Sequence, residues 1–294
     1  MDFTLYWFML PVAFIIANLA MLTGIGGSAL FTPIFLVVFP LLGPAYPLES
    51  AAAAIGASLL TATFGFFSGF LGYVRRGLID FRAVPPFVWV GVPLAIAGAV
   101  AAQFLNSDAL RGGYALLMVV LAIVMLRHRK PVVEEIEALA GSGAAAGRLR
   151  DTRRIVSRDG TVYTFPVPRQ GRGAYATALG GFLTGLLSTG IGEVVMPQLL
   201  RANRVPFPVA AATSVVIVIL VLLAASITQM TALALRGGAA AVPWDLVCYT
   251  IPGVLLGGQV APRLQGRVSR RVMESAMGVT FLVIAVAMMW IAIR

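Results

Sequence analysis

Residues 84–105 read VPPFVWVGVPLAIAGAVAAQFL, in which the Gln103 amide and the Trp89 indole are the only side chains that form hydrogen bonds. A helix of this length crosses a hydrocarbon core of about 30 Å. A comparable apolar run recurs at 272–292. Of all 294 residues, 59% are hydrophobic and 12% are charged, which is too little polar side chain to cover a soluble domain. The sequence therefore predicts an all-α polytopic membrane protein.

Gly, Pro and charged residues divide the apolar runs into two sets of five predicted helical segments. The first set covers 5–22, 29–42, 51–73, 84–105 and 110–127, and the second covers 174–189, 193–201, 208–235, 245–263 and 271–292. The second segment of each set is short for a spanning helix, so we expect it to be one arm of a hairpin that enters the membrane. The predicted parts are a first transmembrane repeat at 1–127, a basic cytoplasmic linker at 128–172 and a second transmembrane repeat at 173–294.

The two sets also resemble each other residue by residue. The motif TGIG occurs at 23–26 and again at 189–192. A shift of 159 positions superposes further residues: Pro47 on Pro206, Pro93 on Pro252, Gly98 on Gly257 and Arg111 on Arg270. Matches in a fixed frame indicate an internal duplication.

The placement of basic residues predicts that the two halves have opposite orientations. Arginines follow the third segment at 75–82, and Lys and Arg fill the linker, so both regions are predicted inside. The turn at 106–111 is then outside, whereas the equivalent turn at 263–271 carries four arginines and belongs inside. We therefore expect inverted repeats with both termini outside, and Gly-rich bends that approach the midplane from opposite faces, where a binding site is expected.

The Gly-rich bends are the predicted anion site. Glycine can break a helix and present its amide to a ligand, and a helix that starts just after the break points its positive end there. Ser28 can cap such a helix or donate to a substrate. One GIG alone is more typical of close helix packing. Its recurrence beside a short segment in both halves favours binding.

No Arg, Lys or His lies deep in a predicted spanning segment, so a bound anion would rely on helix ends, hydroxyls and amides. This favours a substrate of modest charge. Each hydroxyl or amide outside the bends also has a plainer interpretation, an ordinary interhelical hydrogen bond. The candidate substrate-binding residues are Asn18, Thr23, Gly24, Gly26, Gly27, Ser28, Ser58, Thr189, Gly190, Gly192, Gln198, Thr213 and Ser214.

Glu193 follows Gly192, where a helix is expected to begin inside the membrane. In one interpretation this carboxylate only caps the helix. In the other, burial and a nearby anionic substrate disfavour its ionised form, so that substrate binding brings a proton onto Glu193. The second interpretation is favoured because its segment offers no cationic partner except Arg201, two turns away.

Several function classes are disfavoured by composition. The chain has one cysteine and one histidine, Cys248 and His128, so no metal or other cofactor is expected. The net charge of +10 is carried between the apolar runs and indicates topology rather than nucleic-acid binding. An embedded enzyme would need a nucleophile with a base, or paired acids, and Ser188 near Gly190 has no such partner. The paired bends therefore favour a secondary transporter of small anions. An anion channel is the main alternative.

The linker contains RRIVSRDGTVYTFPV at 153–167. Asp159-Gly160 between two runs rich in β-formers predicts a small hairpin. The linker itself is interpreted as a basic cytoplasmic connection without chemistry of its own.

The chain resembles the sulfite exporter TauE/SafE family of bacterial membrane permeases, also called the toluene sulfonate uptake permease family. The resemblance spans nearly the whole chain and rests on TGIGGSALFTP at 23–33, GLLSTGIGEVVMP at 185–197, the Ala-rich helices after each, and the basic loop between them. It implies export of sulfite or organosulfonates across the bacterial cytoplasmic (inner) membrane, with Ser28 and Thr189 as substrate contacts. The second bend departs from the first because Glu193 stands where Gly27 does. The expected partners are a small anionic substrate and the lipid bilayer, and a homodimer is left open.

Overall fold

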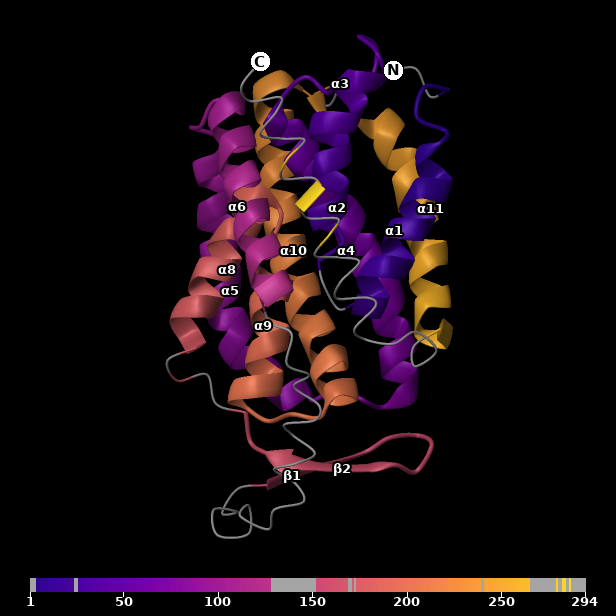
Figure 1. Cartoon of the computed structure of the whole chain (residues 1–294), viewed down its shortest axis with the longest axis vertical. Coiled ribbons are helices and arrows are strands. Elements are labelled where there is room, and N and C mark those ends of the chain that lie inside the picture. The colour runs from indigo at the N-terminus through magenta and orange to yellow at the C-terminus, as the bar shows by residue number, and fades with distance from the viewer. Residues whose placement is uncertain are drawn as a thin grey trace.

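The computed structural model describes residues 4–23, 26–127, 152–168, 171, 173–238 and 241–264, together with positions 279, 282, 283 and 286. The described helices form an elongated bundle, and a two-stranded hairpin lies beyond one of its ends (Figure 1). That end is called the hairpin end below.

The predicted helical segments coincide with described helices to within a few residues, except 271–292, which lies outside the described residues apart from isolated helical positions. The elements are α1 (Met9–Thr23), α2 (Ser28–Pro33), η1 (Ile34–Val38), α3 (Phe39–Leu42), α4 (Ala51–Arg76), η2 (Phe81–Ala83), α5 (Val84–Ala102), α6 (Ser107–Arg127), β1 (Thr152–Val156), β2 (Val162–Pro166), α8 (Gly173–Leu187), α9 (Ile191–Pro197), η4 (Gln198–Ala202), α10 (Phe207–Gly237) and α11 (Trp244–Leu264).

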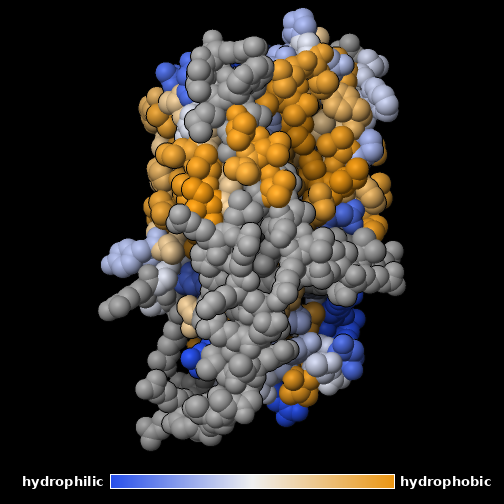
Figure 2. Space-filling model, in the orientation of Figure 1, coloured by the Kyte–Doolittle hydropathy of each residue, from blue (hydrophilic) through white to orange (hydrophobic). Residues whose placement is uncertain are grey.

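Among the described residues, three helical stretches are long and apolar enough to cross a membrane: Ala51–Arg76, Phe81–Ala102 and Phe207–Gly237. The most apolar windows of α4 and α10 are 72% buried within the protein, so these two helices are central. Around them, large apolar side chains face outward, and Trp89 on α5 is 80% exposed. Figure 2 shows that such side chains cover much of the helical surface, whereas hydrophilic residues gather toward the hairpin end. An apolar surface of this extent indicates lipid contact, so the chain is an all-α membrane protein.

The described helices pack mainly in five pairings: α1 with α11, α5 with α8, α4 with α10, α4 with α11, and α10 with α5. Glycine permits the closest approaches. A Cβ at Gly98 would lie 2.0 Å from the Phe182 carbonyl oxygen of α8, and a Cβ at Gly257 would lie 2.5 Å from the Phe14 carbonyl oxygen of α1. Backbones this close exclude any side chain at either glycine.

Both short helices pass through a proline into a π-helical turn. Pro33 ends α2 and η1 follows, while Pro197 ends α9 and η4 follows. Proline has no amide hydrogen to donate to the preceding turn, which favours such a local change in hydrogen-bond spacing.

The predicted hairpin is confirmed. β1 and β2 pair antiparallel from Thr152 with Pro166 to Val156 with Val162, and Gly160 adopts a positive φ of 84° in the turn. The Arg158 amide donates to the Arg76 carbonyl at 3.0 Å, and Arg153 forms an ion pair with Asp80. The hairpin is therefore fixed to the turn that leads from α4 to α5.

Candidate functional site

The two Gly-rich bends contact each other inside the bundle. α2 begins at Ser28 and α9 begins at Ile191, each directly after its bend. A Cβ at Gly192 would lie 3.3 Å from the Gly26 amide nitrogen. From this contact α2 continues toward α3 at one end of the bundle, whereas α9 lies toward the hairpin end (Figure 1). Two short helices thus start at one place and run in opposite directions.

Hydroxyl groups link the two bends to the central helix α4. The Ser28 hydroxyl donates to the Ser188 carbonyl, and Thr32 Oγ1 lies 2.6 Å from Ser58 Oγ and 2.6 Å from Ser188 Oγ. All four side chains are buried. Ser188 has a φ of 64°, a left-handed conformation that costs free energy for a residue with a Cβ and often marks functional sites.

Glu193 is held by one of its two carboxylate oxygens. Oε2 accepts a hydrogen bond of 3.0 Å from the Gly190 amide, which closes the start of α9. Oε1 is inaccessible and lies beside the Gly26 backbone, without a hydrogen bond of regular geometry among the described residues. It faces the first bend, since a Cβ at Gly26 would lie 3.3 Å from it. The carboxylate therefore caps its own helix and also borders the other one.

Tyr114 of α6 and Thr189 complete the cluster. The Tyr114 hydroxyl is fully buried and donates to the Ala29 carbonyl in the first turn of α2 at 2.8 Å. It lies close to the Thr189 hydroxyl and to Glu193. Thr189 Oγ1 is buried beside the Tyr114 hydroxyl and makes no hydrogen bond of regular geometry within the described part of the chain. The Ile191 amide in turn donates to Thr184 Oγ1 at 2.8 Å.

Several predicted residues come together in this site: Gly26, Ser28, Ser58, Thr189, Gly190, Gly192 and Glu193. Gly27 lies beside it and packs against α1, where a Cβ would be 3.3 Å from the Ala20 side chain. Thr23 ends α1, but its side chain and Gly24 lie outside the described residues.

The other four predicted residues form hydrogen bonds elsewhere. Asn18 Nδ2 donates to the Phe14 carbonyl on α1, and Gln198 Oε1 accepts from Thr177 of α8 at 3.1 Å. Thr213 Oγ1 accepts from the Asp80 amide near the hairpin, at 3.0 Å. The Ser214 hydroxyl donates to the Ala211 carbonyl at 2.9 Å and lies 3.8 Å from the Met196 sulfur of α9. Only the Gln198 hydrogen bond joins two helical elements, whereas Asn18 and Ser214 bond within their own helices and Thr213 accepts from the turn after α4.

The sequence interpretation missed Thr32, Tyr114, Ser188 and Thr184. Thr32 could have been found, because it lies one helical turn after Ser28 and shares its face. Ser188 directly precedes the second TGIG and was considered only as an enzymatic nucleophile. Tyr114 carries no local signal. Among the described residues, no three His, Cys, Asp or Glu side chains gather into a candidate metal site.

Comparison with known proteins places these features in a family. A model of the family described as sulfite exporter TauE/SafE matches residues 9–288. The probable membrane transporter protein YunE of Bacillus subtilis (strain 168) is 22% identical over 263 residues, which covers 90% of this chain and 89% of the relative. A probable membrane transporter protein of Xylella fastidiosa (strain Temecula1 / ATCC 700964) is 22% identical over 271 residues, covering 92% and 89% respectively. No solved structure gives a significant match.

Proposed function

This chain belongs to the sulfite exporter TauE/SafE family, and we propose that it is a secondary transporter that exports a small sulfur-containing anion, sulfite or an organosulfonate, across the bacterial cytoplasmic membrane. Family membership and the names of the relatives make it a membrane transporter rather than an enzyme. The substrate, the direction and the coupling ion are the proposed parts.

The contact between the two bends carries this proposal. Each bend is followed by a helix start, and two positive helix ends directed at one buried point stabilise an anion without a cationic side chain. A sulfite or sulfonate group presents three oxygens that accept hydrogen bonds. The Thr189 hydroxyl lies free of regular hydrogen bonds among the described residues, whereas the protons of Ser28 and Thr32 are engaged within the cluster and would turn toward the anion on binding. A group of hydroxyls suits a compact oxyanion of low charge.

Glu193 is the proposed proton-coupling residue. Its Oε1 borders Gly26, next to the place where the anion would bind, and makes no hydrogen bond of regular geometry there within the described residues. Two like charges about 4 Å apart repel by about 4 kcal/mol at an effective dielectric constant of 20. Substrate binding would therefore draw a proton onto this carboxylate, and release of the anion would free it. Such linkage moves the proton and the anion in the same direction, so export of the anion would be driven by its own outward gradient and would carry a proton out with it.

The transport cycle would use the two halves, 1–127 and 173–294, as inverted repeats with the 128–172 linker in the cytoplasm and both termini outside. Three observations support this arrangement. Exchanging the halves turns the pairing of α1 with α11 into that of α8 with α5. Gly98 and Gly257, which match in the 159-residue frame, make the same kind of backbone contact. Both short helices continue from a proline into a π-helical turn. A site between inverted repeats can open alternately to either side.

Flux through the purified protein in proteoliposomes tests the proposal. Sulfite, sulfoacetate and taurine would be compared as substrates under an imposed pH gradient. We expect saturable uptake or efflux of at least one sulfur oxyanion, accelerated by the proton gradient. Unitary currents in planar bilayers would instead identify a channel, and absence of flux for all three compounds would reject the substrate class.

A further inference from the structure

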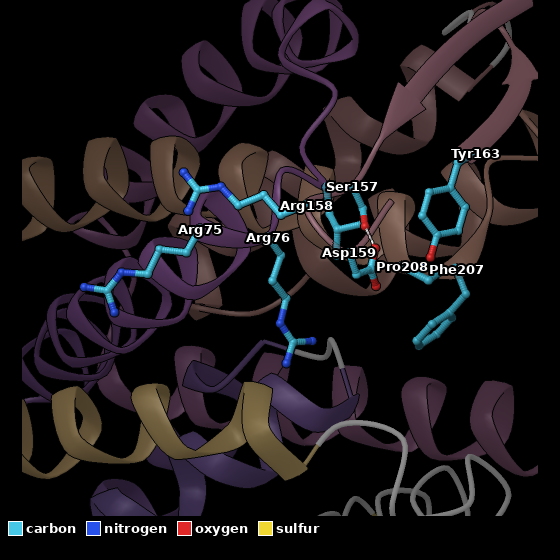
Figure 3. Close-up of a pocket in the computed structure, with 9 residues that line it drawn as sticks. Arg75, Arg76, Ser157, Arg158, Asp159, Tyr163, Phe207 and Pro208 are labelled. Carbon is cyan, nitrogen blue, oxygen red and sulfur yellow. Dashed lines mark hydrogen bonds between the residues drawn. The ribbon is translucent and has the colours of Figure 1, made fainter. Parts of the chain in front are cut away.

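A cavity of about 730 Å³ lies at the hairpin end of the bundle, and none of its lining residues belongs to the Gly-rich bends. It is formed where the end of α4, the turn between β1 and β2, and the start of α10 come together (Figure 3). Small-molecule sites have volumes of roughly 300–1,000 Å³. This cavity is therefore large enough for a ligand.

The lining of this cavity is positively charged. Arg75, Arg76 and Arg158 contribute three guanidinium groups, and Asp159 contributes one carboxylate, so three positive charges less one negative charge leave +2. The Asp159 carboxylate accepts hydrogen bonds from the Ser157 hydroxyl and, at 3.2 Å, from the Thr161 amide. It closes the hairpin turn, and among the described residues it forms no ion pair with Arg75 or Arg158.

The docked hairpin places the backbone of Arg158 beside the end of α4, and the side chains of all three arginines are exposed. The amide of Arg158 donates to the carbonyl of Arg76 at 3.0 Å, which brings the turn against the end of α4. The base of the hairpin is anchored by the ion pair of Arg153 with Asp80, whose side chains are 20% and 5% exposed. A pair so well shielded from solvent fixes the strands, and with them the position of Arg158.

The helix ends around the cavity also favour an anion. Phe207 and Pro208 line it at the start of α10, a helix of 31 residues that has no side-chain cap at its N-terminus. The positive end of α10 therefore contributes to the cavity. The negative end of α4 is already occupied, because the Gly77 amide donates to the carbonyls of Tyr73 and Val74. Tyr163 also lines the cavity, on the side opposite to Arg75 (Figure 3).

We propose that this cavity binds a phosphate group. Guanidinium groups bind phosphate through paired N–H···O hydrogen bonds, and two arginines from different elements can hold it from two sides. The long apolar helix α4 ends at Arg75 and Arg76, the level at which lipid phosphates lie at a membrane surface. The phosphate is supplied either by an anionic lipid headgroup or by a soluble phosphate. This inference does not depend on the identity of the transported anion.

The test compares two charge-removing variants of the full-length protein. The double variant Arg75→Gln/Arg158→Gln removes two cations from the cavity. Arg154→Gln removes a cation from the exposed face of β1, which does not line it, and serves as the matched control. Thermal unfolding is measured in phosphatidylcholine nanodiscs with increasing inorganic phosphate, and in nanodiscs with increasing phosphatidylglycerol.

At least one probe should stabilise the wild-type protein and Arg154→Gln alike, with an apparent affinity at least about tenfold weaker in the double variant because charge-assisted hydrogen bonds are lost. A response to inorganic phosphate in phosphatidylcholine identifies a soluble ligand, and a response to phosphatidylglycerol alone identifies a lipid. Equal responses of the double variant and Arg154→Gln, or no response of the wild-type protein to either probe, would overturn the proposal.

Discussion

The two Gly-rich bends have nearly the same sequence but different surroundings. The start of α2 has no side-chain cap, and its Ser28 hydroxyl instead reaches across to the carbonyl of Ser188 in the other bend. The start of α9 is capped by its own Glu193. Both bends therefore bring hydroxyl groups to the proposed site, and only the second also brings a titratable acid. The two bends share the motif TGIG, but Glu193 stands where the first bend has Gly27, so only the second bend has a group that can carry a proton.

The largest difference is expected in a labelling test of membrane topology. This test comes first because the comparison assumes that the two bends enter the membrane from opposite faces. In a Cys248→Ser background, Asp108→Cys should react with a membrane-impermeant maleimide from outside only, and Arg267→Cys from inside only. Asp108 is well exposed, with a side-chain accessibility of 89%, so its labelling reports sidedness and not burial. Labelling of both positions from the same side would show that the halves are parallel.

Filling the contact between the bends should weaken substrate binding next most strongly. Gly26→Val and Gly192→Val each place a branched side chain at a position where even an added Cβ would lie 3.3 Å from a polar atom of the other bend. Overpacking of about 2 kcal/mol corresponds to roughly thirtyfold weaker binding, measured by calorimetry on the purified variants. Gly112→Val is the control, because a Cβ at this exposed glycine meets nothing within 4 Å. Unchanged affinity in both bend variants would show that these glycines serve only the close packing of helices.

The asymmetry between the bends predicts a specific pH dependence. If binding draws a proton onto Glu193, wild-type affinity rises as the pH falls, by up to about tenfold per pH unit while the unliganded carboxylate is ionised. Glu193→Gln should bind with little pH dependence and lose proton-driven flux while retaining counterflow of substrate. If the variant keeps wild-type proton-driven flux in proteoliposomes, Glu193 is only a helix cap and the bends differ in sequence alone.

Single hydroxyl deletions should have the smallest effects and should separate binding from stability. Thr189→Val removes a donor that has no hydrogen bond of regular geometry in the described structure, so it should weaken binding about fivefold, near 1 kcal/mol, at little cost in thermal stability. Ser28→Ala should lower both the substrate affinity and the thermal stability, because it leaves the Ser188 carbonyl without its hydroxyl donor. Ser226→Ala, another buried hydroxyl without a hydrogen-bond partner in the described residues, is the control. An equal loss of affinity in that control would argue for a general packing effect.

The sequence predicted the helices well because apolar length and Gly, Pro and Arg punctuation are local properties. It also predicted the paired bends, since TGIG occurs twice. It could not rank the isolated polar residues, because their partners are set by tertiary packing. Thr213 bonds to Asp80 only through the docked α4–α5 turn, and Gln198 meets Thr177 only because α8 folds back on α9. Tyr114 enters the site from α6 with no motif around it.

The backbone contacts at Gly98 and Gly257 bear on how such a chain could have originated. Each joins a helix of one half to a helix of the other: α5 to α8 and α11 to α1. A half-length ancestor, if the chain arose by duplication, would have had only minor packing partners within its own chain for its first helix. That helix could pack extensively only on the fourth helix of a second, oppositely inserted copy, which amounts to an exchange of elements between protomers. The present protein is then an obligate dimer fused into one polypeptide, and neither half should fold when expressed alone.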